Sequence, residues 1–153
     1  MSEKKLYGRT LARAQAFQIL FQAEAAGRSV NEVLADTYNV TDGPLSDYAF
    51  KLASGAGSMQ DDIDLVVSSV STNWSVDRIN NVDRNLLRVA IYEILEVDSV
   101  DTAVSINEIV ELAKVFGTDD SPRFVNGILG KITRLMDEGV DVIEHAKADG
   151  EDA

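Results

Sequence analysis

Hydrophobic positions recur every three or four residues along most of the chain, which is the spacing of helices that each bury one face. From Leu45 they form one continuous stripe that predicts a helix of about seven turns through Val70. Ser29 and Glu32 have the spacing of a capping box and predict a short helix before it. Thr41–Pro44 should break the chain between the two. A first helix is predicted by the stripe Leu11, Ala14, Phe17, Leu20 and Phe21.

The second half, after Asn73–Ser75, repeats the helical spacing. Ser105 and Glu108 form a second capping pair that should open a helix ending at Gly117, and Ser121-Pro122 should start the last helix. No segment alternates with the period of a strand. The sequence predicts an all-α fold of about seven helices in two packed halves, with one domain over residues 1–140 and an acidic, frayed tail over 141–153. The other predicted elements are a short turn near Val76–Asn80 and a helix on Leu86, Leu87, Ala90, Ile91 and Ile94.

Composition narrows the class of protein. The length of 153 residues suits one domain, and 45% hydrophobic content suits a folded chain. The absence of cysteine excludes disulfides and thiolate metal sites. The N-terminal residues lack the apolar run of a signal peptide, and no 18 consecutive apolar residues occur that would span a membrane. We therefore expect a cytoplasmic protein.

The charge is unevenly distributed. The net charge is −12, which opposes binding to phosphates. Residues 1–28, however, hold five basic residues against two acidic ones, whereas residues 137–153 hold seven acidic residues against Lys147. This asymmetry fits a nucleic-acid-binding start and an acidic end, and it fits equally well a solvated acidic surface with an incidental basic excess.

Residues suited to catalysis are scarce. The single histidine, His145, lies in the acidic tail, so triads and histidine metal sites are excluded. Neither glycine-rich phosphate loop motif occurs. Asp61–Asp64 lacks the spacing and glycine of a calcium loop and is better interpreted as a solvated helix face. We expect no catalytic residue, metal or cofactor, and no enzyme activity.

Two long segments are specific enough to suggest a family. Residues 104–117 read VSINEIVELAKVFG, and residues 120–129 read DSPRFVNGIL. With VDRNLLRVAIYEI at 82–94 and with Arg9, Arg13, Ala16, Leu20 and Phe21 near the start, they resemble the NusB family. The resemblance covers most of residues 9–135 and is weak between about 28 and 72. It implies two three-helix bundles that share the central region. It also implies transcription antitermination by binding single-stranded boxA RNA of ribosomal RNA transcripts.

The resemblance also implies a partner and a set of RNA-binding residues. The partner is a small-subunit ribosomal protein (NusE), and the RNA polymerase elongation complex is engaged indirectly. Arg9 and Arg13, four apart on one face, would form a cationic strip with Lys4 and Lys5, or simply a soluble helix start. Phe124 would stack on a base or serve as a core aromatic. Asp120 would accept hydrogen bonds from base edges or cap the last helix. The resemblance adds Arg88 and Arg123 to this set.

Other signature residues receive different roles. Phe21, Asp77 and Asp83 match family positions that face the ribosomal partner, and acidic groups there suit a basic protein. Asn107 and Glu108 are expected to make helix contacts and not to bind RNA. Gly127 is expected to allow close approach of a neighbouring helix, since glycine costs about 1 kcal/mol in a helix. Thr10–Ala12 stand where family members often have more arginine, so we expect weak RNA affinity without the partner.

Two other functions stay open. A NusB-like domain also precedes the catalytic domain of some ribosomal RNA cytosine methyltransferases, but this sequence ends at Ala153 without a cysteine, which opposes that enzyme. An acidic helical adaptor that binds only protein is the second alternative; the acidity favours it and the signature segments oppose it. Both a monomer and a homodimer fit the sequence.

Overall fold

The computed structural model describes residues 6–36, 43–71 and 75–151. Within those ranges the chain forms eight α-helices, one short 3₁₀ helix and no strand, which confirms the predicted all-α class. None of these helices is long and apolar enough to cross a membrane. The elements are α1 (Gly8–Ala26), α2 (Val30–Leu34), α3 (Asp47–Ser58), α4 (Gln60–Val70), η1 (Val76–Arg78), α5 (Asn81–Glu96), α6 (Thr102–Phe116), α7 (Ser121–Asp137) and α8 (Val142–Glu151).

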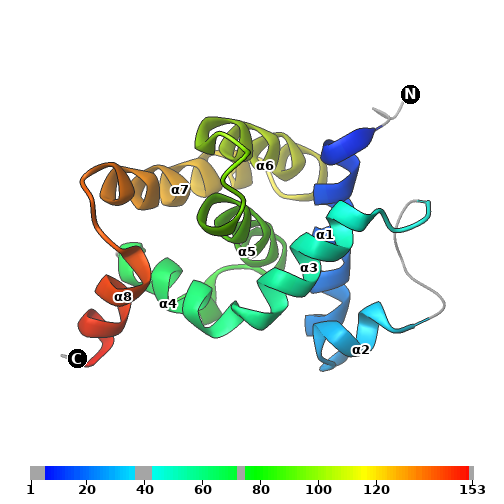
Figure 1. The fold of residues 1–153 in the computed structure, drawn as a ribbon, viewed down its shortest axis with the longest axis horizontal. Coiled ribbons are helices and arrows are strands. Elements are labelled where there is room, and N and C mark those ends of the chain that lie inside the picture. Colours follow the sequence, from blue (N-terminus) through cyan, green and yellow to red (C-terminus); the bar gives the residue numbers. More distant parts are fainter. Residues whose placement is uncertain (1–5, 37–42, 72–74, 152–153) are drawn as a thin grey trace.

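Helix α5 is central to the molecule (Figure 1). Helices α1 and α3 pack against it and against each other, and α6 and α7 do the same on its other side. The two groups of helices thus share α5, as the sequence predicted. Its side chains are buried almost throughout, because residues such as Leu86, Leu87 and Ile91 meet both groups and are fully buried. One continuous hydrophobic core runs through both halves.

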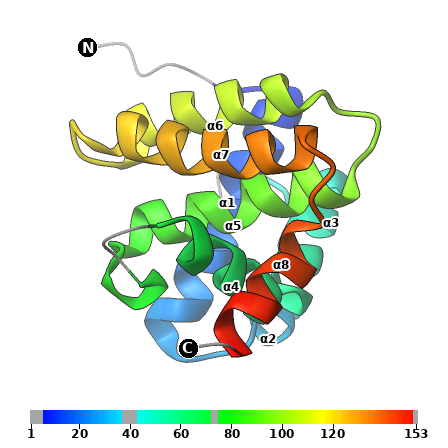
Figure 2. The same ribbon diagram turned by 90° about the vertical axis from the view of Figure 1, so that its left-hand side faces the viewer.

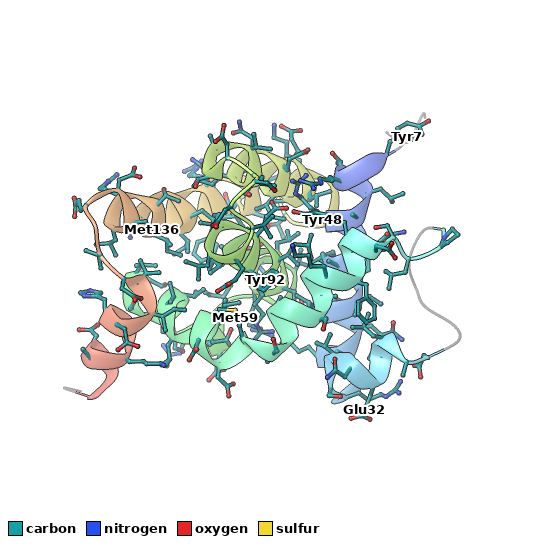
Figure 3. The ribbon with its side chains drawn as sticks, viewed as in Figure 1. Tyr7, Glu32, Tyr48, Met59, Tyr92 and Met136 are labelled. Carbon is teal, nitrogen blue, oxygen red and sulfur yellow. The ribbon has the colours of Figure 1, made fainter. Side chains whose placement is uncertain are left out.

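The predicted long helix over residues 45–70 is wrong, because the structure breaks it into α3 and α4 at Met59. Met59 has φ −101° and ψ 11°, outside the helical region. Its side chain still packs against the core, so the hydrophobic stripe continues through the break. Before the break, a β-carbon added to Gly55 would overlap the ring of Tyr92 on α5 (Figure 3). Glycine at that position therefore allows α3 and α5 to approach closely.

The two predicted capping boxes have different outcomes. At Ser29 the box is present: the Glu32 amide donates to Ser29 Oγ at 3.1 Å, and the Ser29 amide donates to the Glu32 carboxylate at 3.3 Å. The box at Ser105 is wrong, because α6 begins one turn earlier at Thr102. Ser105 is instead 1% exposed and donates to a carboxylate on α5. Helix α7 begins at Ser121 itself, whose hydroxyl accepts from the Thr118 amide.

The segment after Asp141 differs from the frayed tail that the sequence predicted. It forms helix α8, which packs on α4 at the lower left of Figure 1. Val142 and Ala146, one turn apart, are 3% and 2% exposed and belong to the main core. Lys147 on the same helix lies 3.7 Å from an oxygen of Asp62 on α4. The described acidic residues of this segment, Asp141, Glu144 and Asp149, are exposed to solvent.

Candidate nucleic-acid interface

Arg13, predicted to bind phosphate, is instead an internal residue that is 2% exposed. Its Nε donates to both oxygens of Glu93 on α5, at 2.9 and 3.0 Å, and its Nη1 donates to Glu108 on α6 at 3.2 Å. Glu93 is 1% exposed and also accepts from Ser105 at 2.6 Å and from Tyr48 of α3. We call Arg13, Tyr48, Glu93, Ser105 and Glu108 the Glu93 network. It joins α1, α3, α5 and α6, so the RNA-binding role of Arg13 is corrected.

Arg88, also predicted to bind RNA, lies in a second internal network and is 5% exposed. Its Nε and Nη2 donate to the two oxygens of Asp64 on α4, each at 2.8 Å. Its Nη1 donates to Glu24 on α1 at 3.1 Å and to Asn85 at 2.9 Å. Arg84 pairs with the same Glu24, and its pKa is lowered by burial and by the neighbouring Arg88 charge. Because its donors face protein carboxylates, Arg88 is not available to RNA.

Among the described residues of the predicted cationic strip, Arg9 is the one that is exposed. It lies in the first turn of α1, with its guanidinium carbon 4.3 Å from the centre of the Tyr48 ring. Such a cation–π contact contributes on the order of 0.5–1 kcal/mol at an exposed site. Burial and the hydrogen bond to Glu93 raise the pKa of Tyr48 to about 12, so this phenol stays neutral as a donor. Lys4 and Lys5 lie outside the described residues.

A depression of about 460 Å³ brings together predicted RNA and partner residues. One wall comes from the α6–α7 loop and the start of α7, and the other from η1 and the start of α5. Figure 2 shows these two segments at the same edge of the molecule, on the left. The lining residues are Arg78, Ile79, Asn80, Asp83, Thr118, Asp120 and Phe124. The sequence placed Asp120 and Phe124 with RNA and Asp83 with the protein partner, and the fold makes them neighbours.

Phe124 and Asp120 occupy the upper wall of this depression. Phe124 is half-buried: its ring packs on the core and also lines the depression. The structure therefore fits both predicted roles, a core aromatic and a surface on which a base can stack. Asp120 is exposed at the N-cap position of α7, but its side chain makes no capping hydrogen bond. Its carboxylate is therefore not engaged as a helix cap. Arg123, between them, is exposed on the outward face of α7.

Asp83 lies on the lower wall and is 4% exposed. Its Oδ2 accepts from the Asn80 side chain at 3.0 Å, whereas its buried Oδ1 has no hydrogen-bond partner among the described residues. A buried acceptor without a partner costs roughly 1–3 kcal/mol. The other predicted partner residues differ in exposure: Asp77 of η1 is exposed, and Phe21 of α1 is half-buried with its ring 5.8 Å from Phe17.

Sequence reasoning did not select Arg78, Asn80 and Thr118, which line the depression. The Asn80 side chain caps α5 by accepting a hydrogen bond from the Asp83 amide at 2.9 Å. The spacing of Asn80 and Asp83 in the sequence does indicate such a cap. Nothing local in the sequence indicates that Thr118 faces η1.

The expected role of Gly127 is wrong, because a β-carbon there would meet no atom within 4 Å. The helix-contact role of Glu108 is confirmed, since it accepts from Thr10 at 2.8 Å and from Arg13.

The two groups of helices around α5 define a single all-helical domain, and its sequence matches known proteins. Residues 10–134 match the NusB family. The transcription antitermination protein NusB of Salinispora tropica is 45% identical over 127 residues, covering 81% of this chain and 93% of its own. That of Streptomyces coelicolor is 42% identical over 132 residues, covering 83% and 93%. The chain belongs to the NusB family.

Solved structures agree. NusB of T. maritima superposes with a TM-score of 0.74 at 32% identity, covering 85% of this chain and 93% of its own. A structure of antitermination factors NusB and NusE in complex with double-stranded RNA matches with a TM-score of 0.70 at 28% identity, covering 82% and 96%. The family match begins in α1 and ends within α7, so α8 lies beyond it.

Proposed function

We propose that this chain is a transcription antitermination factor that binds the boxA element of ribosomal RNA transcripts together with the small-subunit ribosomal protein NusE. Family membership supports it, and so does the related structure that contains NusB, NusE and RNA. The protein acts in the cytoplasm as a binding factor for the elongation complex and catalyses no reaction.

The depression between the α6–α7 loop and η1 is the observation that carries this proposal. Phe124 offers a ring edge or face to an unpaired base, a contact of roughly 1–3 kcal/mol. Asp120 offers a carboxylate to base donors beside it. Asp83, on the opposite wall, contributes a negative charge that suits a basic partner protein. RNA and partner would thus touch each other as well as this chain, which makes their binding mutually supportive.

The partner is needed because the chain supplies few cations. Arg13 and Arg88 are buried against carboxylates, so the phosphate contacts fall to exposed cations: Arg78, which lines the depression, Arg123 at the start of α7, and Arg9 of α1. Lys4 and Lys5 stay the predicted N-terminal contacts. Each phosphate contact with a single strand adds about 0.7 to the slope of log affinity against log salt. We therefore expect weak binding of RNA by this protein alone and a shallow salt dependence.

Fluorescence anisotropy with a boxA oligonucleotide and NusE tests the proposal. Phe124→Ala should lower the affinity of the ternary complex about 5- to 150-fold, the range that corresponds to one stacked base. Phe50→Ala is the matched control, because Phe50 is also an aromatic side chain, 51% exposed, on α3. Equal affinity of both variants and wild type for boxA RNA would refute the assignment of the RNA site to the α6–α7 loop.

The acidic protein-only adaptor is the second candidate, favoured by the net charge of −12 and by the two internal arginines. It predicts NusE binding without any selectivity for boxA over a scrambled RNA. Sedimentation of the free protein at micromolar concentration reports whether the monomer or a homodimer is the binding species.

A further inference from the structure

The outward face of α7 is cationic, although the protein as a whole is strongly acidic. Arg123, Lys131 and Arg134 are all exposed on this helix, and Asp137, its last residue, is its single acidic residue. None of the three cations lies within 4.0 Å of a carboxylate in the part of the chain that the structure describes. Lys131 makes one hydrogen bond, to the carbonyl oxygen of Val70 at 3.3 Å. No carboxylate of the described residues therefore neutralises these charges.

The cations share the exposed side of α7 with Phe124 of the RNA site. At 100° per residue, Arg123 and Arg134 share the centre of the exposed face, and Lys131 lies on the same flank as Phe124. Lys131 is seven residues beyond Phe124, which places it about 10 Å further along the helix axis. Figure 2 shows α7 on the side of the molecule turned to the viewer, with no other ribbon over it. A ligand that leaves Phe124 therefore meets no other helix along this face.

Two glycines lie between these cations. A β-carbon at Gly127 or Gly130 would meet no atom within 4 Å, so no neighbouring helix requires glycine at either position. Each glycine costs about 1 kcal/mol relative to alanine in a helix interior. Their effect on the surface is to leave the helix backbone bare between Arg123, Lys131 and Arg134. An extended chain can therefore lie close to the helix with a cation on either side.

We propose that this face of α7 binds the phosphodiester backbone of RNA that extends beyond the boxA element, with Lys131 and Arg134 as the contacts. Charge complementarity selects the ligand, because three unpaired cations in an acidic protein match a polyanion. Continuity with the depression selects the strand, because the face begins at Phe124. The assignment rests on the proposed function and extends the footprint along α7 toward α8.

The test compares a minimal boxA oligonucleotide with the same RNA lengthened by six nucleotides at its 5′ or its 3′ end, each bound in the presence of NusE. For wild type, one of the two extensions should raise the affinity. Lys131→Gln with Arg134→Gln should abolish that gain and leave the minimal RNA unaffected. Loss of two phosphate contacts to a single strand should make the slope of log affinity against log salt shallower by about 1.4 for the extended RNA. This difference corresponds to roughly 25-fold in affinity between 0.1 M and 1 M salt.

Lys51→Gln with Lys147→Gln is the charge-matched control, since both lysines are exposed on other helices, α3 and α8. Gly130→Gln probes the bare backbone without changing charge; it should reduce the gain while the melting temperature does not fall. Equal loss in the lysine control, or no gain from either extension in wild type, would overturn the assignment to α7 while boxA binding stands. Failure of wild type to select minimal boxA RNA would overturn the proposed function and this inference together.

Discussion

Replacing Arg13 by alanine should destabilise the fold and should not act as a simple loss of an RNA contact. The change removes the guanidinium whose Nε donates to both oxygens of Glu93, at 2.9 and 3.0 Å, and whose Nη1 reaches Glu108. Glu93, 1% exposed, would keep only the hydroxyl donors of Tyr48 and Ser105. An uncompensated carboxylate would then remain in the interior.

The magnitude follows from this geometry. Removing one partner of a buried ion pair costs about 3–5 kcal/mol, most of it from the charge left behind. For a domain of this size, 1 kcal/mol shifts the melting temperature by about 2–4 °C. Arg13→Ala should therefore melt roughly 6–20 °C below wild type. Arg9→Ala, which removes an exposed cation one turn earlier, should stay within about 1 kcal/mol of wild type.

Thermal unfolding followed by circular dichroism at 222 nm is the assay, with a double-mutant cycle as its control. Because a buried pair can be replaced by neutral groups at little cost, Arg13→Met with Glu93→Gln should recover part of the loss. Arg13→Ala that melts with wild type while RNA affinity falls would refute the internal role and return this residue to the RNA surface.

Three other perturbations separate the roles of particular contacts. In urea titrations, Gly127→Ala should raise the unfolding free energy by about 1 kcal/mol. Gly55→Ala should lower it by about 1–3 kcal/mol, because the added methyl group overlaps Tyr92. The opposite order would contradict the packing described at both sites. The phenol of Tyr48 should ionise near pH 12, which is measured as the 295 nm absorbance that Tyr48→Phe removes. Because its pKa is raised, its stabilising effect is complete below about pH 10 and is lost as the pH rises toward 12. Ionisation near pH 10 would disprove the bond to Glu93. Ending the chain after Asp141 should lower the free energy of unfolding by about 2–4 kcal/mol, because the buried Val142 and Ala146 are lost. Binding of boxA RNA should be retained. An unchanged melting temperature would show that α8 does not pack on α4.

The features predicted well from the sequence are those that local spacing determines. The stripes of α1, α5 and α7 have the helical period, and Ser29 and Glu32 satisfy each other within one turn. The predictions failed where a distant residue decides. Ser105 and Glu108 have the same spacing as Ser29 and Glu32, yet they bind Glu93, Thr10 and Arg13 of other helices. No local pattern distinguishes these two cases.

The candidate site was predicted in part for the same reason. The resemblance to the family identified Asp120, Phe124 and Asp83, and the structure shows that they share one depression. Arg13 was assigned to RNA because it stands four residues after Arg9, and Arg88 because of the resemblance to the family, but carboxylates from α1, α4, α5 and α6 surround them. Gly127 was assigned to helix packing, and only the surrounding atoms show that the space beside it is open. Burial by remote segments is the information that a single sequence lacks.

The most direct test of the account is the coupling between RNA and the ribosomal partner on this protein. Anisotropy titrations give the affinity for boxA RNA with and without NusE, and calorimetry gives the affinity for NusE with and without the RNA. Linkage requires the two ratios to be equal. The account predicts that NusE raises boxA affinity at least about tenfold, a coupling of about 1.4 kcal/mol, and leaves a scrambled RNA unaffected. The same affinity for boxA RNA with and without NusE would contradict a shared site at the depression.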